Sequence, residues 1–244
     1  MCKSNLRQSA NLIYGSYIAF FACVVLISSG AIAQSIPDNE VSAFELAQLT
    51  VQPGEQVSGE IPVSSGTASN PEASFIPVTI THGPKPGPVL ALIAGIHGSE
   101  YAPIMAMQGL PELIDPASLS GTLIVVHVAN MPAFQGRTIY FGPGDLKNLN
   151  RSFPGVADGT ITERIAYTLT QQVMMRSDYL IDIHAGDGNE KLRPSYSAYY
   201  AEAGGETVVQ ESRRIAVAFG LDTIVQFAGS YDSAEHAIYT SAQA

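Results

Sequence analysis

Three short segments that are rich in consecutive apolar residues constrain the fold most. They are VLALIAGI (89–96), GTLIVVHVAN (121–130) and YLIDIHAG (179–186). In each segment apolar residues follow one another directly, which predicts a strand that is buried on both faces. Strands of this kind occur in sheets that helices cover from both sides.

Helical patterns lie between and after these strands. The segment 160–178 begins with a capping box formed by Thr160 and Glu163, and apolar residues follow at every fourth position. Further helices are predicted over 103–114 and 205–220. The alternation of strands and helices predicts an α/β fold, a three-layer sandwich in which helices cover both faces of a mixed, mostly parallel sheet.

The sequence before these strands has the character of short or peripheral strands. Turn glycines and alternating apolar positions over 49–63 predict a hairpin or edge strands. The segment FIPVTIT (75–81) alternates as a strand does, but Pro77 lacks an N–H group, which predicts an edge strand. The Gly/Pro-rich segment HGPKPGP (82–88) predicts a turn.

The N-terminus has the pattern of a secretory signal peptide. Lys3 and Arg7 precede a short apolar core that ends in an A-x-A sequence at Ala33. We therefore expect residues 1–33 to be removed and the protein to be secreted or periplasmic. The alternative is an uncleaved membrane anchor, although the apolar core is short for a membrane span. No second long apolar run follows, so we expect no membrane association after cleavage.

The predicted cleavage also removes both cysteines, Cys2 and Cys23. A mature chain without thiols has no disulfides and no cysteine-ligated zinc, so any metal must be bound by histidines and carboxylates. The formal net charge of −10 argues against a nucleic-acid partner, whose binding surfaces are usually basic. The sequence does not indicate an oligomeric state.

Two histidines follow buried strands at their carboxyl ends, where α/β sheets bind ligands. His97 comes directly after 89–96, Glu100 lies three residues further on, and His184 ends the strand within 179–186. Two imidazoles and a carboxylate, with a fourth position open to water, can form a catalytic zinc site. The metal lowers the pKa of that water toward neutral pH.

This spacing alone is weak evidence for a metal. An H-x-x-E match often arises by chance. His97 can equally be a loop histidine bonded to backbone, and His184 a histidine bonded at the end of a strand. Asp187, three residues after His184, forms a rival H-x-x-D pair.

A long Gly/Pro-rich segment, 131–155, carries a second group of polar side chains. Asn148, Asn150 and Arg151 lie together in NLNRSFPG, and Arg137 precedes them. A guanidinium group is a rigid fork that matches a carboxylate or an oxyanion, and an amide adds a donor. Arginines beside a zinc site would suit an anionic acyl or amino-acid substrate, although an exposed arginine can simply pair with a surface acid.

Taken together, GIHGSE, NLNRSFPG and DYLIDIHAGDGNE, in this order and spacing, resemble the succinylglutamate desuccinylase/aspartoacylase family of zinc deacylases. These enzymes are relatives of the zinc carboxypeptidases. The resemblance runs from about residue 74 to the end. It implies a zinc carboxypeptidase-like fold and the hydrolysis of the amide bond of a small N-acyl amino acid or peptide-like substrate by metal-activated water.

The resemblance also implies roles for the residues above. His97, Glu100 and His184 would bind zinc, and Asn150 and Arg151 would bind the substrate carboxylate. Arg137 is similar to an upstream arginine that polarises the scissile carbonyl in the family.

The sequence departs from the family pattern at the general base. In the family this base is a glutamate on a later strand, and none of the glutamates downstream of His184 has a matching context. We therefore expect the base to lie beyond the end of this chain and its activity to be impaired, since a general base contributes about 10²–10⁴-fold. The expected organisation is a signal peptide (1–33), an N-terminal linker and β segment (34–73), and an incomplete zinc deacylase catalytic domain (74–244).

Other functions remain open on the sequence. A non-catalytic module that binds zinc and a carboxylate would use the same residues without the base. A carboxypeptidase-like peptidase would use the same metal and arginines. A serine α/β-hydrolase is disfavoured because the chain has no G-x-S-x-G motif.

Overall fold

The structure is a computed structural model that describes residues 40–66, 72–190, 195–201 and 205–227. The predicted signal peptide, 1–33, lies outside the described residues. Over the ranges that the structure describes, no helix has both the length and the apolar character needed to cross a membrane.

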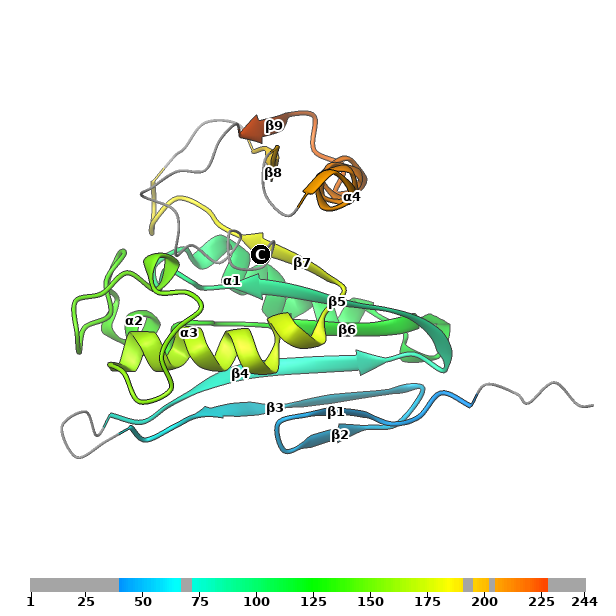
Figure 1. Cartoon of the computed structure of the whole chain (residues 1–244), viewed down its shortest axis with the longest axis horizontal. Helices are drawn as coiled ribbons and strands as arrows, with labels where there is room; N and C mark the ends of the chain where they lie inside the picture. The colour runs from blue at the N-terminus through cyan, green and yellow to red at the C-terminus, as the bar shows by residue number, and fades with distance from the viewer. Residues whose placement is uncertain (1–39, 67–71, 191–194, 202–204, 228–244) are drawn as a thin grey trace, which may run out of the picture. The chain divides into compact units, whose positions relative to one another are not determined.

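A five-stranded mixed sheet forms the centre of the fold (Figure 1). Its strands, in spatial order, are β3 (Glu55–Val63), β4 (Ser74–His82), β6 (Ser120–Val126), β5 (Lys85–Ala94) and β7 (Tyr179–Ile183). β3, β4 and β6 pair antiparallel, whereas β6, β5 and β7 are parallel. The three apolar segments thus form three neighbouring parallel strands, whose carboxyl ends meet at one edge of the sheet.

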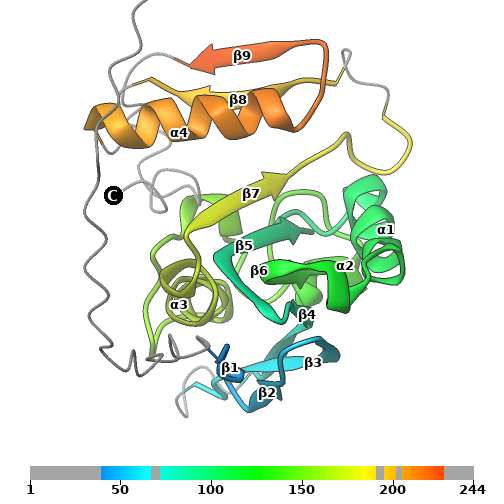
Figure 2. The same ribbon diagram turned by 90° about the vertical axis from the view of Figure 1, so that its right-hand side faces the viewer.

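Helices cover both faces of this sheet (Figure 2). α3 (Ile161–Gln172) packs on one face, and α1 (Tyr101–Gly109) and α2 (Met131–Gly136) pack on the other. Successive residues of the central strands point to opposite faces, so that Val125 is buried beneath α1 while Val126 belongs to the core beneath α3. This explains why β5 and β6 are apolar, and the predicted α/β sandwich with helices on both faces is confirmed. The prediction that 179–186 forms a strand buried on both faces is wrong, because β7 lies at an edge of the described sheet and all of its residues are half-buried.

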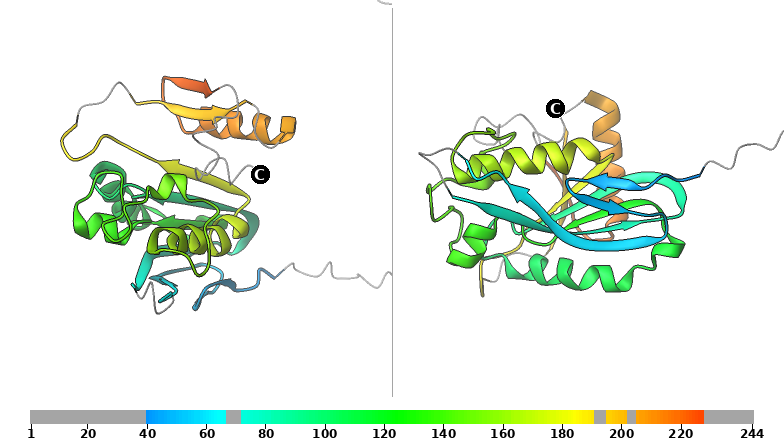
Figure 3. Two further views of the ribbon diagram at one scale, coloured as in Figure 1. Left: turned by 60° about the vertical axis from the view of Figure 1, so that its left-hand side comes forward. Right: turned by 90° about the horizontal axis from the view of Figure 1, so that it is seen from below.

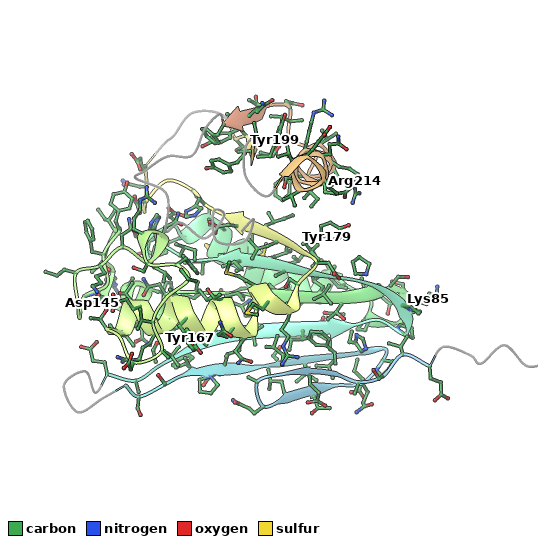
Figure 4. The ribbon with its side chains drawn as sticks, in the orientation of Figure 1. Lys85, Asp145, Tyr167, Tyr179, Tyr199 and Arg214 are labelled. Carbon is green, nitrogen blue, oxygen red and sulfur yellow. The ribbon has the colours of Figure 1, made fainter. Side chains whose placement is uncertain are left out.

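The first turn of α3 is bonded to the loop that precedes it. The Thr160 N–H donates to the Glu163 carboxylate at 2.8 Å, as the predicted capping box requires. The Asp145 carboxylate accepts the Thr162 N–H at 3.0 Å, and Lys147 pairs with Glu163. Burial alone would raise the pKa of Asp145, but hydrogen bonds from Thr160 and Thr162 outweigh it and lower the pKa. Asp145 therefore anchors its loop beside α3 (Figure 4).

The prediction that FIPVTIT forms an edge strand is wrong. β4 pairs with β3 on one side and with β6 on the other, and β3 forms the edge. The Pro77 carbonyl accepts the His127 N–H at 3.0 Å, one position beyond the last β4–β6 pair, Val78–Val126. Because the N and C=O of a strand residue face the same neighbour, the missing N–H costs only the terminal bond of this ladder.

The remaining elements are short. A β1–β2 hairpin contributes Leu46 and Val51 to the core beneath α3. β8 and β9 pair in parallel, with α4 between them in sequence and packed on β8 (Figure 3). The bounds of these elements are β1 (Phe44–Leu46), β2 (Leu49–Val51), β8 (Ser197–Tyr200), α4 (Gly205–Ala218) and β9 (Ile224–Phe227), with 3₁₀ helices η1 (Leu110–Leu113), η2 (Pro116–Ser118), η3 (Leu149–Arg151) and η4 (Met174–Arg176).

Candidate metal centre

His97, Glu100 and His184 lie together at the carboxyl ends of β5 and β7. One nitrogen or oxygen atom from each side chain lies within 4.8 Å of the others. His97 is three residues past the end of β5, and His184 directly follows β7. The structure therefore brings together the three side chains that the sequence suggested as metal ligands, because parallel neighbours end at the same edge of the sheet.

The Glu100 carboxylate lies between the two imidazoles. His97 Nδ1 is 2.8 Å from Oε1, and His184 Nδ1 is 2.8 Å from Oε2. The two imidazole centroids are 5.1 Å apart. Both histidines thus direct Nδ1 toward a shared centre, which is the arrangement that a single cation requires.

The outer nitrogen of each imidazole has its own acceptor. His184 Nε2 donates to the Asp182 carboxylate at 2.7 Å, and His97 Nε2 donates to the Asn148 side-chain oxygen at 3.2 Å. Such outer partners fix the orientation of a metal-binding histidine and keep its proton on the nitrogen that faces away from the metal. Asp182 and Asn148 therefore prepare both Nδ1 atoms for ligation.

Electrostatics make the cluster attractive to a cation. Burial alone would raise the pKa of Glu100, but hydrogen bonds from His184 and His97 lower it to about 2. Burial alone would lower the pKa of His184, but the carboxylates of Asp182 and Glu100 raise it well above its usual value. The proton on His184 Nδ1, which faces Glu100, thus occupies a position that a metal ion could take. His97 and Glu100 are buried, whereas the His184 side chain is 32% exposed, so the centre is open on one side.

Small residues let the His97 loop fold tightly. Gly95 follows β5 with a φ of +72°, a conformation that favours glycine. A Cβ on Gly98 would lie 2.2 Å from the Ala133 carbonyl carbon, so only glycine lets this loop approach α2. Glu100 precedes the first residue of α1, yet its side chain faces the histidines instead of capping the helix.

Arg151 lies in a cavity beside the centre. This cavity of about 390 Å³ is lined by Lys147, Asn148, Arg151 and Glu163, among others. Asn148 connects the metal centre to the turn that carries Asn150 and Arg151, because its side-chain oxygen contacts His97 and also accepts the Asn150 N–H at 2.8 Å. Asn150 is buried.

Arg137 lies apart from these residues. It follows α2 and lines a separate cavity of about 480 Å³ together with Tyr101 and Phe134. Within the described part of the chain, its side chain makes no hydrogen bond or ion pair with His97, Glu100 or His184.

The sequence did not predict the outer partners of the two histidines. Asp182 lies two residues before His184 in the same strand, and this D-x-H spacing could have identified it, since alternate residues share a face. Asn148 belongs to the polar group expected in NLNRSFPG, but no spacing in the sequence indicates that it contacts His97. Asp187, the rival ligand, lies outside the cluster, and its carboxylate accepts the Ser99 hydroxyl at 2.6 Å.

Two imidazoles and a carboxylate at the carboxyl ends of parallel strands, open on one side, define an α/β protein with a candidate catalytic metal centre. Residues 86–244 match the family model of the succinylglutamate desuccinylase/aspartoacylase catalytic domain. The chain therefore belongs to this family.

Individual relatives agree with this assignment. The chain is 41% identical over 115 residues to the N-alpha-acetyl-L-2,4-diaminobutyric acid deacetylase of Halomonas elongata, a match covering 47% of this chain and 33% of that protein. A succinylglutamate desuccinylase from Silicibacter sp. TM1040 is 26% identical with a TM-score of 0.68, covering 84% of this chain and 60% of that one. The product-bound ectoine utilization protein EutE (DoeB) from Ruegeria pomeroyi is 25% identical with a TM-score of 0.67, covering 80% and 58%.

A metallo-carboxypeptidase from Burkholderia cenocepacia has the same fold, with a TM-score of 0.54 at 14% identity, covering 75% of this chain and 51% of that one. The carboxypeptidase-like fold predicted from the sequence is thus confirmed. The matches span 33% of the curated relative and 58–60% of the two solved deacylase-family structures above.

Proposed function

We propose that this chain contributes the zinc centre of an amidohydrolase that removes the acyl group from a small N-acyl amino acid. The convergence of His97 Nδ1, His184 Nδ1 and the Glu100 carboxylate carries this proposal. The curated relative, named as a deacetylase of N-alpha-acetyl-L-2,4-diaminobutyric acid, supports a substrate of this class. We further propose that the protein acts after secretion or in the periplasm.

The donor set fits zinc. Two neutral imidazoles and one carboxylate, with one side open, are typical of catalytic zinc sites, and softer sulfur ligands are absent from the described cluster. When bound, zinc would supply a water that is acidic enough to serve as a nucleophile near neutral pH.

The chain's own residues would hold and orient the substrate. Arg151, in the cavity beside Asn148, would bind the substrate carboxylate through its planar guanidinium. Asn150 on the same turn would add an amide donor. Arg137 is the candidate for polarising the scissile carbonyl, a role that requires its side chain to move toward the centre when substrate binds.

The test is an assay of the zinc-loaded protein against N-acetyl, N-succinyl and C-terminal peptide substrates, with detection of the released amine. Release from N-acyl amino acids that is abolished by chelation supports the proposal. Cleavage of C-terminal peptide bonds alone would indicate a peptidase. Tight binding of metal and of N-acyl amino acid without turnover would contradict the proposal and indicate a binding module.

Arg137 allows a prediction that separates stability from function. Its φ of +53° places a non-glycine residue in the left-handed region at the end of α2, where glycine is preferred. Arg137→Gly is expected to raise the free energy of unfolding by about 0.5–1 kcal/mol, as measured by urea denaturation, and to weaken substrate binding.

Ala47→Gly is the matched control, because Ala47 has a φ of +51° in the β1–β2 turn, away from the centre. It should stabilise the protein similarly and leave substrate binding unchanged. A destabilised Arg137→Gly protein would refute the expected gain in stability. Unchanged substrate affinity would refute the proposed role of Arg137 in binding the substrate.

A further inference from the structure

Three consecutive large side chains, two of them aromatic, are exposed beside the metal centre. Ile139, Tyr140 and Phe141, in the loop that joins α2 to η3, are 52%, 45% and 52% exposed. The Tyr140 ring packs edge-on against the His97 imidazole, with centroids 5.1 Å apart, and the Phe141 ring packs edge-on against Tyr140, with centroids 6.4 Å apart. We call Ile139, Tyr140 and Phe141 the apolar rim. It begins at a predicted metal ligand and extends outward from it by a further aromatic ring.

The charged side chains of the same loop face the fold. Asp145 and Lys147 are the two charged residues of the segment 138–148. The Asp145 carboxylate accepts the Thr162 hydroxyl at 2.7 Å. The Lys147 ammonium group pairs with the Glu163 carboxylate on α3. The loop thus covers its charges and exposes its apolar side chains, which reverses the usual arrangement at a protein surface. Exposed apolar side chains that gather in one place mark sites of binding.

Backbone pairing holds the rim in place. Phe141 forms an antiparallel bridge with Asn148, and the Gly142 N–H donates to the Lys147 carbonyl at 2.8 Å. The side-chain oxygen of Asn148 lies 3.2 Å from His97 Nε2, so this turn is fastened to the metal centre at its second end as well. A surface that is ordered in advance binds a ligand without the entropic cost of ordering a loop.

The same turn also borders the cavity that contains Arg151. Asn148 and Arg151 line this cavity, and Asn148 is the residue that pairs with Phe141. A guanidinium group and an apolar surface therefore flank His97 from one short segment of the chain. A ligand that matches both has a carboxylate at one end and an apolar group at the other.

We propose that the apolar rim is a specificity subsite, which selects N-acyl amino acids that carry an aromatic or large aliphatic group beside the amide bond. This inference rests on the proposed function for the reaction, but ligand preference can be measured as binding without turnover. The amino-acid side chain and the acyl group both flank the amide bond, so either can supply the apolar group. The substrate named for the curated relative is a diaminobutyric acid derivative, which has a polar amine in place of such a group.

Calorimetric titration of the zinc-loaded protein with sulfonamide analogues tests the preference, because sulfonamides resist hydrolysis. N-methylsulfonyl-L-phenylalanine places the phenyl ring on the amino-acid side, and N-benzylsulfonylglycine places it on the acyl side. One of them is expected to bind about tenfold more tightly than N-methylsulfonylglycine, as partial burial of a phenyl ring predicts. The analogue that gains affinity identifies the side of the amide that contacts the rim. Equal affinities, or tighter binding of N-methylsulfonyl-L-2,4-diaminobutyrate than of both phenyl analogues, would overturn the proposal.

Phe141→Ala assigns the preference to the rim. The Phe141 ring contacts Tyr140, and among the described residues it makes no ring contact with His97 or His184. The variant should therefore reduce the gain from the phenyl ring to about twofold or less and leave the affinity for N-methylsulfonylglycine and for zinc within about twofold of the wild type. Phe141→Leu should retain most of the gain. In an active protein, Phe141→Ala should raise KM for phenyl-containing substrates more than it lowers kcat.

Phe219→Ala is the matched control, because Phe219 is a 45% exposed phenylalanine that follows α4, outside this loop. It should leave every affinity unchanged. A folded Phe141→Ala protein that keeps the phenyl preference would overturn the proposal. A wild-type dimer that Phe141→Ala dissociates, measured by sedimentation velocity, would also overturn it, because the rim would then be an interface between two copies of the chain. Phenyl preference without hydrolysis of any N-acyl amino acid would support the subsite and count against the proposed function alone.

Discussion

Replacing His184 or His97 by alanine is expected to abolish stoichiometric zinc binding. Each side chain supplies one of three converging donor atoms. A zinc site bound by four protein ligands has a total binding free energy of roughly 10–16 kcal/mol, so one ligand corresponds to about 10²–10³-fold in affinity. Metal analysis after dialysis, together with chelator competition, would measure the loss.

His127→Asn is the control for removing a histidine. His127 lies after β6 and has its own partners, Thr79 Oγ1 at 2.8 Å and the Met107 carbonyl at 3.0 Å. Burial lowers its pKa, and it is not part of the cluster. This variant should bind one zinc per chain as the wild type does. If both His97→Ala and His184→Ala still bound one zinc per chain, the proposed zinc site would be wrong.

The zinc affinity of the wild type is also expected to depend on pH. Asp182 and Glu100 raise the pKa of His184 against the effect of burial, so the metal-free protein keeps a proton on this imidazole above the usual range. Zinc must displace that proton. The apparent zinc affinity of the wild type should therefore rise with pH through neutrality. His184→Ala, which lacks the proton, should show a shallower dependence.

The fold was largely predictable because its strongest signals are local. Consecutive apolar residues in β5 and β6 fill two cores at once, half-buried residues of β7 pack against both, and the capping box of α3 marks its first turn. Errors arose where proline was taken to place a strand at the edge of the sheet or to indicate a turn. Pro77 lies in an internal strand because its nitrogen faces the end of the β6 ladder. The predicted turn at 82–88 is partly extended, since β5 already begins at Lys85.

The candidate site was predictable only in its ligands. Their positions follow from strand ends, which the sequence indicates. Their partners depend on contacts between distant loops: Asn148 lies 51 residues from His97, and Asp187 lies 88 residues from Ser99. No periodicity or spacing encodes such pairings, because they depend on how neighbouring loops fold over the sheet edge. Arg137 illustrates the same limit, since its loop places it in a different cavity from Arg151.

The outer partners of the two histidines differ in charge, and this difference predicts opposite effects of two substitutions. Asp182 offers His184 a carboxylate, whereas Asn148 offers His97 a neutral amide oxygen. An anionic acceptor makes the imidazole a more basic ligand. Asp182→Asn should therefore lower zinc affinity by about 10–100-fold. Asn148→Asp should raise the affinity, because it gives His97 the same kind of partner.

Because Asp182 is partly buried, the loss of zinc affinity expected for Asp182→Asn is larger than it would be at an exposed position. Its Oδ1 atom is buried without a hydrogen-bond partner among the residues that the structure describes, so within this part of the chain the imidazole of His184 compensates the carboxylate. Removing the charge weakens that interaction more than it would at an exposed position, because solvent screens it less.

Asp178→Asn is the matched control. Asp178 directly precedes β7, and its carboxylate accepts the Val89 N–H at 2.8 Å, far along the strand from His184. It therefore changes the same residue type without touching either imidazole. Equal zinc affinities for Asp182→Asn and Asp178→Asn would contradict the role of Asp182. A weaker site in a folded Asn148→Asp protein would show that geometry, and not the charge of the outer partner, controls how His97 binds the metal.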